Sequence, residues 1–311
     1  MAPSTVSTKV APIPKPKQLI PTCKDDPNKE KTPLQAISQG VTLPSIPVFS
    51  SYDKHRAWLL THMAGAFRVF ARKGFTEGMS GHISIRDPEH PHTFWTNPLA
   101  KHFGMLTASD MVLVDYNGKV VGGNTSRPAN GAGFLIHSAV HKARPDVHAA
   151  CHMHGKAGKA WSAFGKKLEM INQDACYFYG DAQAVYEEFG GVVLDEAEGK
   201  RLAAALGPRG KGMILRNHGL LSSWLTEINQ QKTVGNTVDE AAYLYTLMER
   251  SCEIQLMVDA AAALSDREKI YIDEEAAEYT FRMESDPETL YWEFQPDLDY
   301  EYEVSGGAFE K

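Results

Sequence analysis

Cysteine is scarce in this sequence, and no long apolar segment is present. The four cysteines are far apart and form no CxxC pair; they are Cys23, Cys151, Cys176 and Cys252. This spacing indicates neither a thiolate zinc site nor a disulfide framework, and a reducing compartment explains it most simply. Since no run of about 18 apolar residues occurs, no membrane-spanning helix is expected. We expect a cytoplasmic protein without a membrane partner.

Positive charge is also in short supply. The 311 residues include 32 Lys and Arg against 39 Asp and Glu, which gives a formal net charge of −7. Nucleic-acid binding needs a basic face, so this balance argues against a nucleic-acid partner. It does not exclude a local basic pocket that binds a small anion. The N-terminal segment lacks the apolar core of a secretory signal. It is basic and has no acidic residue before Asp25, so an organellar transit peptide is the alternative to a cytoplasmic location.

Changes in composition divide the chain into three parts. Residues 1–48 are rich in proline and develop no apolar periodicity. They predict a tail that is either disordered or laid across a neighbouring subunit. Residues 49–265 carry the regular patterns of a folded domain. Residues 266–311 are acidic and aromatic, and the neighbours Tyr291, Trp292 and Phe294 favour packing over a solvated tail.

The middle part alternates between helical and strand-like periodicity. Tyr-Asn-Gly at 116–118 is a hairpin signal inside the longest strand-like run. The expected helices span about 51–73, 134–142, 156 onward, 196–207 and 236–263. The expected strands span about 82–86, 93–97, 111–121, 147–152, 191–195 and 212–217.

Three histidines stand at the ends of two expected strands. His152 and His154 close the run VHAACHMH, and residues i and i+2 of a strand point to the same face. His218 leaves the strand GMILRN and is followed by a turn glycine. Three neutral nitrogen ligands with an open fourth position are typical of a catalytic zinc site. The competing interpretation is a set of partly buried polar histidines and an Asn-His-Gly turn.

A second histidine pair precedes the strand. His137 and His141 are four residues apart on an expected helix, so they share one face. One of them could reach the metal or orient one of its ligands. The alternative is an ordinary capped or solvated helix face.

The sequence resembles the class II aldolase/adducin family over about residues 55–262. The resemblance rests on GMSGHISIR (78–86), TNPLAKHFGMLTASDMVLVD (96–115), HSAVHKARPDVHAACHMHG (137–155) and MILRNHGLL (213–221). It implies a three-layer α/β/α fold with a central mixed, mainly antiparallel sheet. It also implies a small-molecule substrate and a homo-oligomer, such as a C4 tetramer.

The same resemblance implies the metal site and its chemistry. His152, His154 and His218 match the family's zinc ligands, with iron or another divalent transition metal as the alternative. The metal would act as a Lewis acid on a carbonyl oxygen and an adjacent hydroxyl oxygen.

The sequence departs from the family's sugar-phosphate aldolases in two ways. Their metal-binding glutamate, which also serves as the acid and base, matches Gly133 here. Their phosphate-binding pairs match Gly81-His82, Leu99-Ala100 and the stretch 130–133, which supply fewer hydrogen-bond donors. We therefore expect a substrate that is not a sugar phosphate.

Other residues could take over the missing roles. The candidate catalytic residues are Asp174, His137 and Tyr177, and for Asp174 a plain turn aspartate is the alternative. The candidate substrate-binding residues are Ser80, Gly81, His82, Asn97 and Lys101.

Three functions fit these patterns. The first is a metal-dependent lyase of class II aldolase type that acts on a small, non-phosphorylated carbonyl or hydroxy substrate. The second is another metalloenzyme on the same fold, either a decarboxylase or an Fe(II) oxygenase. The third is a non-catalytic, adducin-like interaction protein, although a scaffold has no chemical need for the three histidines.

Overall fold

The computed structural model describes residues 31–189, 191, 196–225 and 237–311. The chain divides into two compact units, Met1–Leu43 and Pro44–Lys311. In the first unit the described part contains one short helix, α1 (Pro33–Ile37). Thr32 caps this helix, because its side chain accepts a hydrogen bond from the Gln35 amide. This turn lies inside the stretch predicted to be a tail.

The second unit is built on an eight-stranded sheet with the order β4-β3-β2-β1-β5-β8-β7-β6. Only the pair β6–β7 is parallel among these neighbours, which confirms the mixed, mainly antiparallel sheet. The strands are β1 (His82–Arg86), β2 (Thr93–Thr96), β3 (Val112–Asp115), β4 (Val120–Gly123), β5 (Val147–Met153), β6 (Gln183–Tyr186), β7 (Gly212–Leu215) and β8 (Gly219–Leu225).

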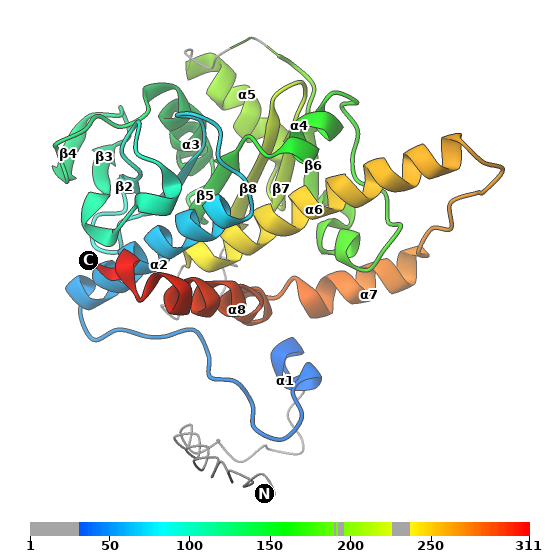
Figure 1. Ribbon diagram of the computed structural model, residues 1–311, viewed down its shortest axis with the longest axis horizontal. Coiled ribbons are helices and arrows are strands. Elements are labelled where there is room, and N and C mark those ends of the chain that lie inside the picture. Colours follow the sequence, from blue (N-terminus) through cyan, green and yellow to red (C-terminus); the bar gives the residue numbers. More distant parts are fainter. Residues whose placement is uncertain (1–30, 190, 192–195, 226–236) are drawn as a thin grey trace, which may run out of the picture. The chain divides into compact units, whose positions relative to one another are not determined.

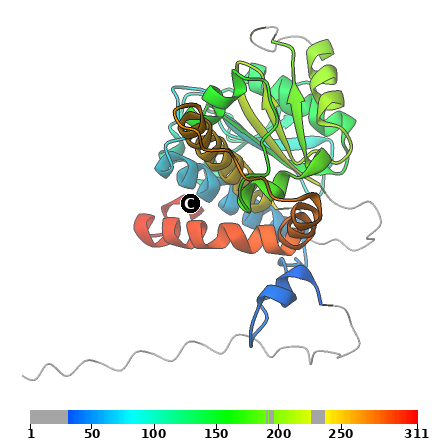
Figure 2. The same cartoon turned by 90° about the vertical axis from the view of Figure 1, so that its right-hand side faces the viewer.

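Helices cover both faces of this sheet, as the two ribbon views show (Figure 1, Figure 2). On one face lie α2, α4, α6 and α8, and on the other lie α3 and α5. The helices of this unit are α2 (Tyr52–Arg72), α3 (Gly131–Ala143), α4 (Lys156–Ser162), α5 (Glu196–Leu206), α6 (Val238–Ala263), α7 (Glu274–Glu284) and α8 (Pro287–Ser305). Short 3₁₀ turns are η1 (Phe103–Met105), η2 (Ala108–Asp110), η3 (Asp174–Phe178), η4 (Gly180–Ala182) and η5 (Ala308–Glu310).

The strand alternation assigns side chains to the two faces. On β1, Ile83 and Ile85 join the large apolar core shared with α2 and α6. His82 and Ser84 therefore point to the opposite face, where α3 lies. This division places a polar layer between the sheet and α3, close to the end of β5.

Most expected elements are present at or near their expected bounds. The strand expected at 191–195 lies outside the described residues except for Gly191, and β6 and β8 were not anticipated. In the aromatic C-terminal stretch Tyr291 and Phe294 on α8 are buried, as expected. Other aromatic residues of the stretch are exposed, namely Tyr271, Tyr279, Tyr300 and Tyr302. No described helix is long and apolar enough to cross a membrane.

Candidate metal centre

The antiparallel pairing of β5 with β8 brings the three histidines together. His152 lies on β5 opposite Leu221, and His154 follows the end of that strand. His218 lies in the tight turn between β7 and β8, next to Asn217, whose φ of 59° is left-handed. The end of β5 and the start of β8 are neighbours in the sheet, so all three imidazoles reach the same place.

Their ring nitrogens form a compact cluster. One ligand atom from each histidine lies within 4.8 Å of the others, and this is the potential metal-binding group found among the described residues. His154 Nε2 and His218 Nε2 are 3.2 Å apart. Two nitrogens bound to one tetrahedral zinc at 2.0–2.1 Å are separated by about 3.3 Å. The donor set and this spacing therefore fit a zinc-like ion.

The protonation state of the cluster also suits a metal. His152 Nδ1 donates a hydrogen bond to the Leu220 carbonyl at 2.8 Å, which leaves its Nε2 lone pair free. Burial lowers the pKa of His152 well below its usual range and that of His218 to about 4. Burial lowers the pKa of His154 as well. Neutral imidazoles at pH 7 are the form that binds a metal.

A second group of polar side chains lies beside the cluster, between β1 and α3. His82 and His152 are opposite each other on adjacent strands, with ring centroids 5.0 Å apart. His82 Nδ1 is 2.7 Å from His137 Nε2, and Ser84 Oγ is 2.5 Å from His137 Nδ1. Ser84 Oγ is also 2.7 Å from His141 Nε2. His137, predicted as catalytic, thus lies behind His82 in this row.

Comparison with known proteins identifies the family and the fold. The family model described as "Class II Aldolase and Adducin N-terminal domain" matches residues 61–256. The chain belongs to this family. The three histidines and all eight strands of the sheet lie inside the matched region, and this fold typically depends on a divalent metal.

Three similar proteins illustrate the range of the family. "Decarboxylase NovR" of Streptomyces niveus is 44% identical over 69% of this chain and 75% of its own length. "4-hydroxy-3-prenylphenylpyruvate oxygenase/4-hydroxy-3-prenylbenzoate synthase" of Streptomyces roseochromogenus subsp. oscitans is 44% identical over 69% of this chain and 73% of its own length. The structure of "L-fuculose 1-phosphate aldolase" from Glaciozyma antarctica PI12 has 37% identity and a TM-score of 0.74. That alignment covers 85% of this chain and 96% of the other.

In this class II aldolase fold, α6 supports the segment that carries His154. Glu249 accepts hydrogen bonds from the Ala157 amide at 2.8 Å and the Gly158 amide at 3.0 Å. Tyr245 donates from its hydroxyl to the Met153 carbonyl at 3.0 Å. The two α6 residues are four apart and thus on one helix face. Sequence reasoning missed both, because nothing local pairs them with the distant His154 segment.

Three of the predicted substrate-binding residues flank His82. Ser80 and Gly81 precede it, and Asn97 donates from Nδ2 to the Gly81 carbonyl at 3.4 Å. Lys101 is engaged elsewhere, because its ammonium group lies 2.6 Å from both carboxylate oxygens of Asp110. Their contacts with a substrate remain predictions.

Asp174 and Tyr177 lie on η3, apart from the three histidines within this chain. The Tyr177 hydroxyl donates to Glu284 of α7 at 3.1 Å. Burial raises the pKa of Tyr177 above its ordinary value. Asp174 is close enough to Tyr243 and Glu293 to raise their pKa, after the larger effect of burial. Among the described residues Asp174 does not join the histidine cluster. The catalytic roles of Asp174 and Tyr177 remain predictions.

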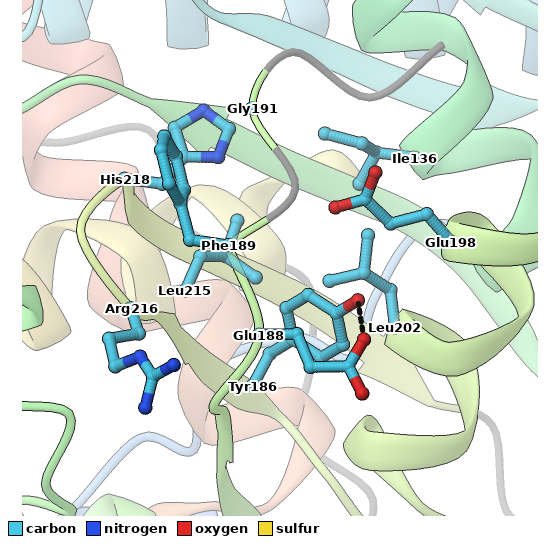
Figure 3. Close-up of a pocket in the computed structure, with 10 residues that line it drawn as sticks. All are labelled: Ile136, Tyr186, Glu188, Phe189, Gly191, Glu198, Leu202, Leu215, Arg216 and His218. Carbon is cyan, nitrogen blue, oxygen red and sulfur yellow. Dashed lines mark hydrogen bonds between the residues drawn. The ribbon is translucent and has the colours of Figure 1, made fainter. Parts of the chain in front are cut away.

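A small cavity lies beside His218 on the α3 and α5 face (Figure 3). Its volume is about 10 Å³, which is room for roughly one water molecule. Ile136, Leu202 and Leu215 form an apolar part of its wall. The charged residues Glu188, Glu198 and Arg216 also line the cavity, which is too small for a substrate.

Proposed function

We propose that this chain is a metal-dependent enzyme that breaks a carbon–carbon bond next to the carbonyl of a small, non-phosphorylated oxo acid. The observation that carries the proposal is the ligand set. His152, His154 and His218 supply three neutral nitrogens, and no carboxylate joins them among the described residues. The resemblance places a glutamate in such sites, and this chain has Gly133 instead.

A neutral ligand set favours an anionic substrate. Histidine ligands leave the whole charge of a divalent ion uncompensated, whereas a glutamate would cancel part of it. A 2-oxo acid offers a carboxylate and a carbonyl oxygen side by side, which suits such a site. When bound, the metal supplies Lewis-acid polarisation of that carbonyl and stabilises negative charge formed during cleavage.

The protein supplies geometry and a polar neighbour. The Leu220 carbonyl fixes the orientation of His152 through its Nδ1, and Glu249 fixes the segment that follows His154. His82, on the strand next to His152, gives the site a further polar side chain. Orientation of this kind is what ligand-supporting hydrogen bonds contribute to metal sites.

The place where family aldolases bind phosphate supports a non-phosphorylated substrate. The Leu99 amide already donates to the Pro128 carbonyl at 2.8 Å. The Gly133 amide already donates to the Asn130 side chain at 3.1 Å. With these donors engaged, a phosphate group would find few partners there.

Metal analysis and turnover assays test this proposal. Protein purified without added metal should contain close to one zinc or iron per chain. His154→Ala should lose most of that metal, whereas His90→Ala, at an exposed histidine, should keep it. The loaded protein should release carbon dioxide or an aldehyde from a panel of oxo acids that includes 4-hydroxyphenylpyruvate.

Two results would contradict the proposal. One is efficient cleavage of fuculose 1-phosphate or rhamnulose 1-phosphate with no turnover of any oxo acid. The other is full metal binding by the His154→Ala variant. Homo-oligomer formation, expected as a tetramer, can be measured on the same samples by light scattering.

A second candidate is an oxidative decarboxylase that consumes dioxygen. The names of the two Streptomyces relatives favour it, since one is a decarboxylase and the other an oxygenase acting on an arylpyruvate. Three histidines with open positions suit Fe(II) as well as zinc. Oxygen consumption that is stoichiometric with turnover, and present only in the iron-loaded protein, would favour this candidate.

A further inference from the structure

The space beside Gly133 is filled by the imidazole of His82. A Cβ atom added at Gly133 would come closer than 3.0 Å to His82 Cδ2, Nε2 and Cε1, a separation that real Cβ atoms essentially never show. In the sugar-phosphate aldolases this position carries the glutamate. Here the ring of His82 stands where that glutamate side chain would begin.

The Val147 carbonyl fixes the direction of the hydrogen bonds in the row formed by His141, Ser84, His137 and His82. His141 Nδ1 is 3.0 Å from the Val147 carbonyl, and a carbonyl oxygen can only accept. The proton of His141 is therefore on Nδ1, and its Nε2 is an acceptor. Ser84 Oγ, 2.7 Å from this Nε2, must donate its single proton to it.

The protons of His137 and His82 are fixed in the same way. With its proton given to His141, Ser84 Oγ accepts from His137 Nδ1 at 2.5 Å. The Nε2 of a neutral His137 then accepts from His82 Nδ1 at 2.7 Å. The proton of His82 is on Nδ1, and its Nε2 carries a lone pair. Burial keeps the rings of His137 and His141 neutral, because it lowers their pKa values, that of His141 to about 3.

The Nε2 of His82 has no hydrogen-bond partner among the described residues, and His82 as a whole is 5% exposed. The ring lies against His152, at the edge of the metal cluster. A ligand held by the three histidines would therefore lie beside this ring.

We propose that His82 is the hydrogen-bond acceptor for a substrate hydroxyl group in this site, standing in place of the family glutamate. Ser84, His137 and His141 are positioning residues that fix which nitrogen of His82 carries the proton. The identity of the substrate as an oxo or hydroxy acid rests on the proposed function. The orientation and tautomer of His82 do not.

Imidazole nitrogen NMR of the zinc-loaded protein tests the tautomer. In the wild type, Nδ1 of His82 should be protonated and Nε2 unprotonated, with the signals assigned by loss in His82→Asn. The reverse tautomer would overturn the proposal, whether or not any oxo acid is turned over. This measurement needs no substrate and no variant beyond the assignment.

Ser84 offers a matched pair of variants. Ser84→Ala removes the hydroxyl that links His137 to His141, so both tautomers of His82 should become populated. Ser84→Thr keeps a hydroxyl at the same place and should retain the wild-type tautomer. Both should bind zinc as the wild type does, since Ser84 contacts no metal ligand. An unchanged His82 spectrum in a folded Ser84→Ala protein would overturn the positioning role.

Gly133 and Gly131 offer a second pair in one turn of α3. Gly133→Ala places a methyl group on the His82 ring and should shift its imidazole signals, with zinc content retained. Gly131→Ala meets open space within 4 Å and should leave these signals unchanged. Equal spectra for the two variants would show that the ring is not where the structure places it.

Binding of a hydroxy acid probe tests the role of the lone pair. Adding 4-hydroxyphenyllactate to the zinc-loaded wild type should shift the Nε2 signal of His82. Loss of one such hydrogen bond in His82→Asn should weaken binding roughly 3- to 10-fold. If the probe binds with no change at His82 Nε2 and equal affinity for His82→Asn, the proposed contact is wrong. Failed turnover of oxo acids alone would contradict only the proposed function.

Discussion

At the scale of single residues, the feature that sets this protein apart is a set of histidines kept neutral by burial. His141 is 1% exposed and lies between the Val147 carbonyl and Ser84. Its pKa is lowered to about 3, first by burial and then by the charge of Arg86. Since the unfolded chain titrates near 6.5, the folded state binds this proton more weakly. Stability from the neutral ring is fully present above pH 6.5 and is lost as the pH falls toward 3.

This difference gives a prediction for His141→Gln, whose amide can donate to Val147 and accept from Ser84 without titrating. Between pH 7 and pH 5 the metal-free wild type should lose about 2 kcal/mol of unfolding free energy through His141 that the variant does not lose. Urea denaturation at both pH values measures it. The exposed His90→Gln serves as control and should follow the wild type. Parallel pH dependence in all three proteins would contradict the neutral, buried state of His141.

At the scale of elements, the metal site depends on how α6 holds the segment after β5. Glu249 accepts from two amides at the start of α4, one on each carboxylate oxygen, and glutamine replaces one of these oxygens with an NH₂ group that can only donate. Glu249→Gln should therefore lower the unfolding free energy by about 1–3 kcal/mol, because the NH₂ group of the glutamine would face a backbone N–H donor and leave it without an acceptor. It should also weaken metal binding by about 10-fold or more through His154.

Glu253 provides the comparison for this variant, since it lies one helical turn further along α6 and is exposed. Glu253→Gln should change the unfolding free energy by no more than about 0.5 kcal/mol and leave metal affinity alone. Denaturant unfolding and metal competition with a chelator measure both quantities. Equal behaviour of the two variants would mean that Glu249 does not support the His154 segment.

The periodicity of strands and helices in the sequence predicts part of the site. Strand alternation placed His152 and His154 on one face, and the strand before His218 placed it at a sheet end, so the cluster could be anticipated. The helix period paired His137 with His141. Ser84 could not be found in this way, because its contacts arise only when β1 lies beside β5 and under α3. Pairing across 53 residues leaves no local pattern to read.

His82 illustrates the same limit in a different way. Its sequence position marked it as a substitution in a phosphate-binding pair and as a candidate substrate-binding residue. The structure shows the ring occupying space that only a glycine at 133 leaves open. The glycine at 133 and the histidine at 82 are far apart in the sequence but in contact in the structure. A single sequence offers no means of connecting them.

At the scale of the whole molecule, the family domain is completed by a segment outside it. The matched region ends at residue 256, whereas α8 begins at Pro287. Leu290, Phe294 and Leu298 of α8 nevertheless belong to the main apolar core with α2 and α6. A Cβ at Gly65 of α2 would collide with Leu298, so the two helices are in close contact. The C-terminal extension is therefore part of the core.

This packing predicts a large effect of Phe294→Ala. The side chain is fully buried, so its removal leaves a cavity and should lower the unfolding free energy by about 3–5 kcal/mol. Val304→Ala, at an exposed position of the same helix, should change it by no more than about 0.5 kcal/mol. Equilibrium denaturation with urea measures both. The core under α8 also contacts β5, so Phe294→Ala should weaken metal binding in proportion to local unfolding. Unchanged stability of this variant would mean that α8 is dispensable for the fold.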